Sequence, residues 1–416
     1  MSNRDQESQG FSRRNFIKGG LVAGATGLGL SFSDKMVLAS QLISGRPATI
    51  ETIQGVGVPP GLVRMNLNEN PLGTSPKAIE AIAHKMFSVN RYGMEMNDLL
   101  QALSEFDQVV LPKPDPGAQR SFFRTPSGPY FVTPGSSLIL NLLCLAYLSQ
   151  NGGEVIEAEF GYGAISRAAS NYKKNFGVDI KVIKAPMTPS YKHDLNLMAE
   201  LVTDKTSIVV ITNPNNPTGT LLQLDEIETF VKKIPSSVIV VIDEAYLHFA
   251  EQDQIPSAIP LATKYDNVIA VRTFSKAYAL ASLRLGYCVA SEKIQTEMRK
   301  YYQEGPNVLA SVAGAAAVRD INHLRKSRDA VWNFKKRCYQ VFDEMGIEYI
   351  TSQGTYVMAN IKTPASRVVR EMRSRNIWIS SRRQRTFRDW IRVSAGTESE
   401  TEVFLQTLKT VLKKSI

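Results

Sequence analysis

Between residues 130 and 290 the chain alternates short apolar or β-branched runs with segments of helical spacing, and this alternation constrains its fold most strongly. Strands that alternate with helices form an α/β domain whose sheet is largely parallel and covered on both faces. Ligands bind such sheets beyond the carboxyl ends of the strands, so we expect the chemically informative residues directly after these runs. The seven strand candidates are Tyr130–Val132, Glu154–Ile156, Ile180–Ile183, Ser207–Thr212, Ser237–Ile242, Asn267–Val271 and Gly286–Ala290.

The pattern changes after Pro306. A long helical stretch, Val308–Met345, is followed by a strand candidate at Thr355–Ile361 and by further alternation to the end of the chain. This predicts a second, smaller α+β domain. The predicted division is therefore an N-terminal signal at 1–39, a segment at 40–100 that packs with the small domain or bridges the two domains, a large domain at 101–305 and the small domain at 306–416.

The first 39 residues have the organisation of a transport signal. The segment Ser12–Lys18 contains Arg13 and Arg14, and it is followed by an uncharged stretch, Gly19–Ser33, and by a small-residue cleavage site at Val37–Ala39. It resembles a twin-arginine export signal, which implies contact with an export machinery, transport of the folded protein and a periplasmic or secreted location. The uncharged stretch is shorter than the roughly 20 apolar residues that span a bilayer, so a permanent membrane anchor is the weaker alternative.

Composition excludes several other classes of function. With 43% hydrophobic and 21% charged residues the chain is typical of a globular protein, and its net charge of +10 suits acidic substrates. No zinc-finger spacing or sustained basic stripe supports nucleic-acid binding, so the surplus charge is expected on a solvated face. The four histidines lack metal-ligand spacing, and no metal is expected. No chemistry is assigned to the three cysteines, Cys144, Cys288 and Cys338.

Three polar segments follow three successive strand candidates: Asn213–Gly219, Asp243–Tyr246 and Thr273–Lys276. This ordered set resembles the fold-type I pyridoxal-phosphate enzymes, and most closely the histidinol-phosphate aminotransferase group, over roughly residues 60–410. The resemblance implies the fold-type I architecture, with a mostly parallel seven-stranded sheet plus a smaller α+β domain. It also implies a pyridoxal 5'-phosphate cofactor and a class I/II aminotransferase that moves an amino group between an amino acid and a 2-oxo acid.

The chemistry of this cofactor explains the roles expected of Asp243 and Lys276. Pyridoxal phosphate is an electron sink whose ring nitrogen must stay protonated, so a carboxylate must face it, and Asp243 ends a buried run where it can do so. A helix cap at a strand end is the plainer interpretation of Asp243 alone. Lys276 would hold the cofactor as a Schiff base and then move a proton, where a solvated surface lysine is the alternative.

The resemblance assigns the remaining cofactor contacts. Asn216 and Tyr246 would bind the phenolic oxygen, although a turn residue and a buried tyrosine are their plainer interpretations. Tyr162 is the candidate ring that stacks on the cofactor, with Phe160 as the alternative because the usual proline of this segment is missing. The phosphate needs donors at a helix start and a cation, which we expect from Ser136, Ser137, Ser275 and Arg284.

The substrate side is assigned in the same way. Arg392 matches the family arginine that binds the acidic group of the substrate, since its planar donors can bind a carboxylate bidentately. Asn70 lies in a segment that resembles the one closing over the substrate. Tyr92 resembles the residue that enters the neighbouring subunit's phosphate site, which implies a homodimer. The basic segment Arg382–Arg385 is either a solvated loop or help for an acidic side chain.

Two questions stay open from the sequence. The same scaffold also supports amino-acid decarboxylation or oxidation, and a cofactor-binding protein without turnover is a third class that intact Lys276 and Arg392 argue against. The sequence also predicts that histidinol phosphate is not the substrate. In the most direct register Ser380 stands where the family has a second, phosphate-binding arginine, unless Arg382 or Arg383 replaces it.

Overall fold

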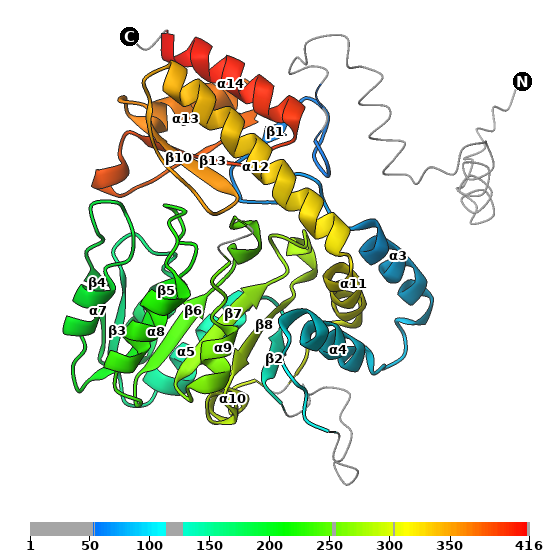
Figure 1. Cartoon of the computed structure of the whole chain (residues 1–416), viewed down its shortest axis with the longest axis vertical. Helices are drawn as coiled ribbons and strands as arrows, with labels where there is room; N and C mark the ends of the chain where they lie inside the picture. The colour runs from blue at the N-terminus through cyan, green and yellow to red at the C-terminus, as the bar shows by residue number, and fades with distance from the viewer. Residues whose placement is uncertain (1–52, 54, 114–127, 252–254, 303, 414–416) are drawn as a thin grey trace, which may run out of the picture. The chain divides into compact units, whose positions relative to one another are not determined.

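The computed structural model describes residue 53 and residues 55–113, 128–251, 255–302 and 304–413 (Figure 1). All of them belong to one unit of the fold, Ala48–Ile416. The predicted signal at 1–39 lies outside the described residues. Within the described ranges, no helix has the length and apolar content that crossing a bilayer requires.

The central sheet has seven strands in the order β2-β8-β7-β6-β5-β3-β4. Neighbouring strands are parallel except at β8, which runs antiparallel to both β2 and β7. Each strand overlaps one of the seven predicted runs, so the predicted α/β class and its largely parallel sheet are confirmed. The strands are β2 (Tyr130–Thr133), β3 (Gly153–Ala158), β4 (Ile180–Ala185), β5 (Thr206–Thr212), β6 (Ile239–Asp243), β7 (Val268–Thr273) and β8 (Gly286–Ala290).

Helices cover both faces of this sheet because its strands are apolar on both sides. In β6, Val240 and Ile242 belong to one core cluster while Ile239 and Val241 belong to the other, as the alternation of a pleated strand requires. The second cluster is closed by α5 (Ser136–Leu148), α6 (Ala164–Phe176) and α10 (Glu292–Arg299). The first is closed by α7 (Leu195–Glu200), α8 (Leu224–Lys233), α9 (Ile259–Lys264) and α11 (Val308–Arg319).

A smaller antiparallel sheet, in the order β12-β13-β10-β9, forms the second domain. Its core combines β10 and β13 with three helices, which confirms the predicted α+β domain. The strands are β9 (Glu348–Ile350), β10 (Tyr356–Asn360), β12 (Ser380–Ser381) and β13 (Trp390–Ser394). The helices are α12 (Ile321–Glu344), α13 (Ala365–Ser374) and α14 (Glu398–Lys413).

The described part of the chain before residue 100 is divided between the two domains, which agrees with the bridging alternative rather than with packing against the small domain. Strand β1 (Val63–Arg64) does join that domain, where it pairs in parallel with β11 (Ile377–Trp378). In contrast, α3 (Pro76–Lys85) and α4 (Glu95–Asp107) pack against α11. The reason is the apolar face of α4, where Leu99 and Leu103 are fully buried in the core of the large sheet.

The predicted helical stretch at 308–345 is two helices rather than one. Asp320 separates them with φ −88° and ψ 65°, and its side chain accepts a hydrogen bond from the backbone N–H of His323 to cap α12. Helix α11 belongs to the core of the large domain, so the domain boundary lies after α11 rather than at residue 306. Short 3-10 helices complete the fold: η1 (Met86–Ser88), η2 (Leu247–Phe249), η4 (Ala281–Leu283) and η5 (Arg385–Phe387).

Candidate active site

The three polar segments predicted from sequence meet at one cavity. They follow β5, β6 and β7, three adjacent parallel strands, so their side chains emerge at the same edge of the sheet. The cavity has a volume of about 1180 Å³. The predicted site residues that line it are Ser136, Ser137, Tyr162, Asn216, Asp243, Tyr246, Ser275, Lys276, Arg284 and Arg392.

Asp243 ends β6 at the bottom of the cavity and is only 3% exposed. Its Oδ1 accepts a hydrogen bond from the backbone N–H of Ala245 at 3.1 Å. Burial raises the pKa of this carboxyl to about 6, and the neighbouring carboxylate of Glu244 adds to the effect. A buried carboxylate of this kind is stabilised by a cation brought to it, such as a protonated ring nitrogen.

Lys276 extends into the cavity from the turn after β7. Its Nζ donates a hydrogen bond to the carbonyl of Leu67 at 3.1 Å and lies 5.8 Å from the centre of the Tyr246 ring. Burial, with a smaller contribution from the positive charges of Arg392 and Arg284, lowers the pKa of this amine to about 8, although Tyr162 and Glu69 act in the opposite direction. A neutral amine fraction is therefore present near neutral pH, as a nucleophile requires.

A chain of hydrogen bonds joins Tyr246, Asn216 and Arg392 along one wall. Nδ2 of Asn216 lies 3.4 Å from the Tyr246 hydroxyl, and Oδ1 of Asn216 accepts from Nη1 of Arg392 at 2.9 Å. Nη2 of Arg392 donates to the carbonyl of Asn66 at 3.0 Å. Because Arg392 lies on β13 and Asn216 follows β5, these contacts connect the two domains at the cavity.

The other end of the cavity is the start of α5. Gly135 precedes this helix with φ +85°, a backbone conformation that favours glycine. A Cβ at this position would lie 2.2 Å from Nη2 of Arg284, so glycine also leaves room for the guanidinium. Nη1 of Arg284 donates to Ser275 Oγ at 3.4 Å. The helix N-terminus, the hydroxyls and the guanidinium together form an anion site.

The structure distinguishes the two candidate stacking rings. Tyr162 lines the cavity and is 38% exposed, with the guanidinium of Arg167 lying 5.3 Å from its ring centre. Phe160 is buried in a separate apolar cluster, where its ring centre lies 4.7 Å from that of Phe387. Only Tyr162 is therefore placed to contact a ligand in this cavity.

The cavity holds a second guanidinium, that of Arg382, from the basic segment for which the sequence left a solvated loop and a substrate contact both open. Arg382 lines the cavity beside Arg392, and its Nε and Nη2 have no hydrogen-bond partner within the described part of the chain. Burial lowers the pKa of Arg382 to about 10, and the positive charge of Arg392 contributes to this. Nε of Arg392 also lacks a partner among the described residues. Two adjacent cations with unused donors are suited to acidic groups.

Two predicted residues do not line this cavity. Nδ2 of Asn70 donates to the carbonyl of Ala277 and to Ser327 Oγ, both at 2.9 Å, so this amide holds the segment in place. Its neighbours Asn68 and Glu69 line the cavity instead. Tyr92 is 78% exposed on the surface.

Comparison with known proteins identifies the family. The family model "Aminotransferase class I and II" matches residues 60–408, which is most of the chain. The chain belongs to this family. The predicted fold, activity and pyridoxal-phosphate cofactor are thereby confirmed for this aminotransferase.

Individual relatives agree with this membership. The aminotransferase is 34% identical over 390 residues to a histidinol-phosphate aminotransferase of Akkermansia muciniphila, a match that covers 92% of this chain and 99% of the relative. A second such aminotransferase, from Hydrogenovibrio crunogenus, is 32% identical, and the match covers 84% of this chain and 88% of the relative. Among solved structures, a putative histidinol-phosphate aminotransferase from Erwinia carotovora atroseptica has a TM-score of 0.75 and is 28% identical in sequence. The match covers 85% of this chain and 97% of that chain.

The residues of the aminotransferase fit the cofactor of its family. The buried carboxylate of Asp243, the amine of Lys276 and the anion site at the start of α5 lie around one cavity. A histidinol-phosphate aminotransferase from Sinorhizobium meliloti, solved in complex with pyridoxal-5'-phosphate, has the same fold at a TM-score of 0.74 and 22% identity, with 98% of this chain and all of that one covered.

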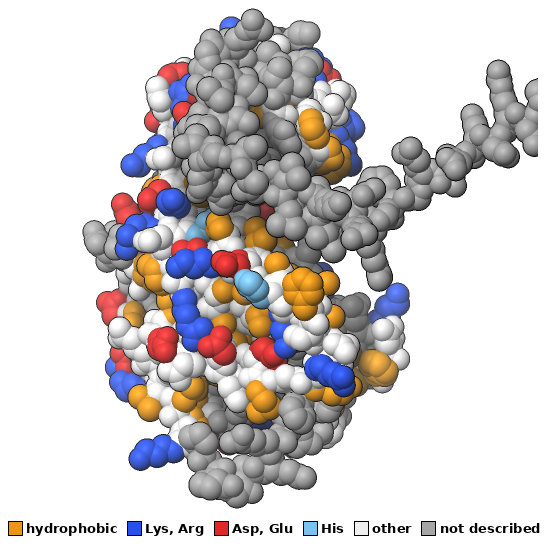
Figure 2. Space-filling view, turned by 90° about the vertical axis from the view of Figure 1, so that its right-hand side faces the viewer, with side chains coloured by type: hydrophobic (Ala, Val, Ile, Leu, Met, Phe, Trp, Pro, Cys, Tyr) orange, Lys and Arg blue, Asp and Glu red, His pale blue; other side chains and the backbone are white. Residues whose placement is uncertain are grey.

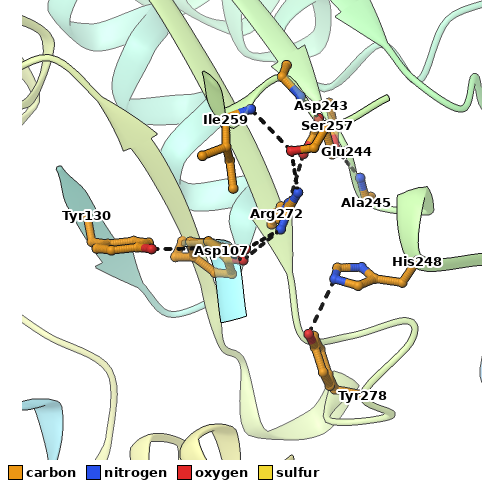
Figure 3. Close-up of polar contacts among 12 residues, drawn as sticks. Asp107, Tyr130, Asp243, Glu244, Ala245, His248, Ser257, Ile259, Arg272 and Tyr278 are labelled. Carbon is orange, nitrogen blue, oxygen red and sulfur yellow. Dashed lines mark hydrogen bonds and ion pairs between the residues drawn. The ribbon is translucent and has the colours of Figure 1, made fainter. Parts of the chain in front are cut away.

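A buried ion-pair network, which sequence reasoning missed, lies beneath Asp243 in the aminotransferase (Figure 3). Arg272 of β7 donates to Asp107 at 2.6 Å, to Glu244 at 2.8 Å and to Ser257 Oγ at 2.7 Å. The second oxygen of Glu244 accepts from the backbone N–H of Ala258. The network ties the end of α4 and the residue that follows β6 to strand β7, and nothing in the local sequence pattern marks its members as partners.

Proposed function

We propose that the aminotransferase uses this cavity to transfer an amino group between an amino acid and a 2-oxo acid. The observation that carries the proposal is the convergence of Lys276, Asp243 and Arg392 on one cavity. When bound, the cofactor supplies an electron sink for the negative charge left on the substrate carbon. The resemblance implies the contacts to this cofactor: Lys276 would hold the aldehyde carbon, Asp243 the ring nitrogen, Tyr246 and Asn216 the phenolic oxygen, Tyr162 the ring face, and Ser136, Ser137, Ser275 and Arg284 the phosphate.

The protein's own groups divide the work of proton transfer and orientation. Once the substrate amine has displaced it from the cofactor, the free Nζ of Lys276, whose pKa is lowered to about 8, would move a proton between the substrate carbon and the cofactor. The carboxylate of Asp243 holds a proton on the ring nitrogen by its charge. Arg392 can bind the substrate carboxylate with donors that the protein leaves unused, which fixes the bond to be broken.

The substrate class follows from the pair of guanidinium groups. Ser380 lies in β12, and Arg382, which the sequence left open as a replacement for the family arginine, lines the cavity from the loop beyond it. That histidinol phosphate is not the substrate stays a prediction, which an assay with this compound tests. We propose that one substrate carries a second acidic group, either a carboxylate or a phosphate monoester, that binds Arg382. The relatives named for histidinol phosphate are consistent with this class.

An amino-donor screen tests the activity. The purified enzyme is incubated with single amino acids or histidinol phosphate and with pyruvate or 2-oxoglutarate, and keto acid, carbon dioxide and peroxide are measured. Keto acid formed together with the new amino acid supports transamination. Carbon dioxide or peroxide as the main product would instead assign the decarboxylase or oxidase alternative.

We also propose that the enzyme is a homodimer in which Tyr92 enters the neighbouring phosphate site. The support is a run of exposed apolar side chains between α3 and α4, with Phe87 92%, Met86 52% and Val89 46% exposed. Figure 2 shows a face on which hydrophobic side chains lie among charged ones. Light scattering should give twice the mass of the chain, and a Phe87→Asp variant should shift it toward the monomer. A monomeric parent protein would contradict the proposal.

Export by the twin-arginine route is proposed from the sequence of residues 12–39. The support is the arginine pair before an uncharged stretch and a small-residue cleavage site.

A further inference from the structure

We infer that Asn68 is a positioning residue that directs the hydroxyl proton of Tyr246 into the active-site cavity. Asn68 lines the cavity, is 2% exposed and donates from Nδ2 to the Tyr246 hydroxyl at 2.9 Å. The inference deepens the proposed function and rests on it, because it takes the phenolic oxygen of the cofactor to lie beside Tyr246. By directing this proton at the phenolic oxygen, Asn68 would lower the pKa that the absorbance of the bound cofactor reports.

The Tyr246 hydroxyl has both of its amide contacts on its acceptor side. It accepts from two amide groups, Nδ2 of Asn68 at 2.9 Å and Nδ2 of Asn216 at 3.4 Å. A phenolic hydroxyl has a single proton to donate, beside the lone pairs that accept. With two donors directed at the oxygen, its own proton points away from both amides and toward the cavity. There it can be donated to an oxygen atom of a ligand.

The orientation of the two amides follows from their other partners. An arginine has only donors, so Nη1 of Arg392 must face Oδ1 of Asn216, which leaves Nδ2 for Tyr246. The backbone N–H of Asn68 donates to Ser394 Oγ at 2.8 Å, and the hydroxyl of Ser394 donates to Oδ1 of Asn68 at 3.0 Å. Nδ2 of Asn68 is then directed at Tyr246.

Asn68 is held by its backbone as well. Its φ is +56°, in the left-handed region that asparagine tolerates better than most residues. The flanking segment is fixed by the backbone N–H of Ser394, which donates to the carbonyl of Met65 at 2.8 Å. Strand β13 of the small domain thus positions Asn68 against Tyr246, a residue of the large domain.

Several charged groups already face Tyr246 and must stay constant in a test. Asp243 faces it from β6, Lys276 from the turn after β7, and Arg382 and Arg392 from the small domain. The ring of Tyr356 on β10 packs edge-on at 5.1 Å. Substitutions at Asn68 leave all of these groups in place.

The test is a pH titration of the absorbance of the bound cofactor without substrate. A hydroxyl that donates to the phenolic oxygen favours its ionised form and lowers the pKa seen in this titration. Asn68→Ala should therefore raise that pKa by about 0.5 to 1 pH unit, the equivalent of one neutral hydrogen bond. Asn68→Asp keeps the shape but draws the Tyr246 proton to its own carboxylate, so it should raise the pKa further.

The Tyr246→Phe background separates the hydroxyl from other causes. If Asn68 acts through the hydroxyl, Asn68→Ala has no further effect in that background, and the effect of Asn68→Asp shrinks to that of its added charge. Ser75→Ala is the matched control for lost stability, because it removes a buried hydrogen bond of 2.5 Å to Asp320 outside the cavity. It should lower the melting temperature and leave the titration unchanged.

Two results would overturn the inference: an unchanged titration in Asn68→Ala, or an equal shift of the Asn68→Ala pKa with and without the Tyr246 hydroxyl. Failure of the proposed function has a different signature, since a parent protein that binds no added cofactor gives no absorbance band to titrate. The titration therefore distinguishes an error about Asn68 from an error about the site as a whole.

Discussion

Nη1 of Arg392 lies 2.9 Å from Oδ1 of Asn216, and this contact joins the small domain to the large domain at the wall of the active-site cavity. Arg392 can reach a substrate carboxylate only with its remaining donors, while Asn216 is held in the orientation that serves Tyr246. The residue that binds substrate and the residues that contact the cofactor are therefore connected before any ligand enters.

Replacing Lys276 with alanine should abolish turnover while part of the cofactor binding remains. The anion site at Arg284 and the start of α5 is untouched, but the amine that moves the proton is gone, so kcat should fall by at least about 100-fold. Cofactor retention is measured by absorbance after dialysis and turnover by keto-acid formation. Lys264→Ala removes an exposed lysine of α9 and serves as the control. Near-normal turnover in Lys276→Ala would refute the assigned role.

Asp243 should make the cofactor-free protein less stable as the pH rises. Its pKa is raised from 3.8 to about 6 by burial, so its contribution to folding is complete below about pH 4 and is lost as pH rises through 6. The loss is roughly 3 kcal/mol in all, and roughly 1 kcal/mol of it falls between pH 5 and pH 7. Urea unfolding of the cofactor-free parent and of Asp243→Asn should show this difference. Parallel pH profiles for the two proteins would contradict it.

Arg382→Ala should weaken only substrates with a second acidic group. Loss of a charge-assisted contact of roughly 1.5–3 kcal/mol lowers kcat/KM for such a substrate by about one to two orders of magnitude. With free alanine as the amino donor, which has one acidic group, the rate of this variant should hardly change. Arg383→Ala is the matched control, because Arg383 is exposed and does not line the cavity. Equal losses for mono- and diacidic donors would show that Arg382 has no part in side-chain recognition.

Arg272→Met should destabilise the protein by about 3–5 kcal/mol, because it leaves the buried carboxylates of Asp107 and Glu244 without their cation. Chemical unfolding measures the loss. The comparison is Arg319→Met, which breaks a solvent-exposed pair with Asp98 and should cost no more than about 1 kcal/mol. Similar losses in the two variants would mean that burial of the Arg272 network contributes nothing.

Export should depend on Arg13 and Arg14. Replacing both with lysine keeps the charge but removes the guanidinium pair of the signal, so a folded protein with bound cofactor should accumulate in the cytoplasm. Cell fractionation and absorbance of each fraction measure this. The same substitution at Arg4 is the control, because it lies outside the arginine pair. Undiminished export would show that the segment is not a twin-arginine signal.

The sequence was sufficient for the sheet and for the cofactor side of the cavity. Buried parallel strands are continuous apolar runs, and the residues that follow them meet at one edge, so Asp243 and Lys276 could be placed at that edge. Their roles came from the resemblance to the pyridoxal-phosphate enzymes. Packing partners could not be found in this way. The apolar faces of α3 and α4 are visible in the sequence, but nothing in their periodicity says that they pack against α11.

The substrate side was the least predictable part. Asn68 and Asn70 are two residues apart, and only the positive φ of Asn68 and its bonds to Ser394 place it at the cavity while Asn70 is bound elsewhere. Arg382 and Arg383 are adjacent arginines, of which only Arg382 lines the cavity. These choices depend on loop conformation and on contacts between distant segments, which residue type does not encode.

The pairing of β1 with β11 also has a consequence for biosynthesis. Val63 pairs with Ile377, so β1 cannot pair until its partner strand has been synthesised, more than 300 residues later. At translation speeds of about 5–20 residues per second, the delay is about 15 to 60 s. A twin-arginine signal directs the export of folded proteins. At the N-terminus of this chain it would leave the ribosome long before the rest of the chain can complete its fold. Export of this enzyme would then have to begin after translation ends.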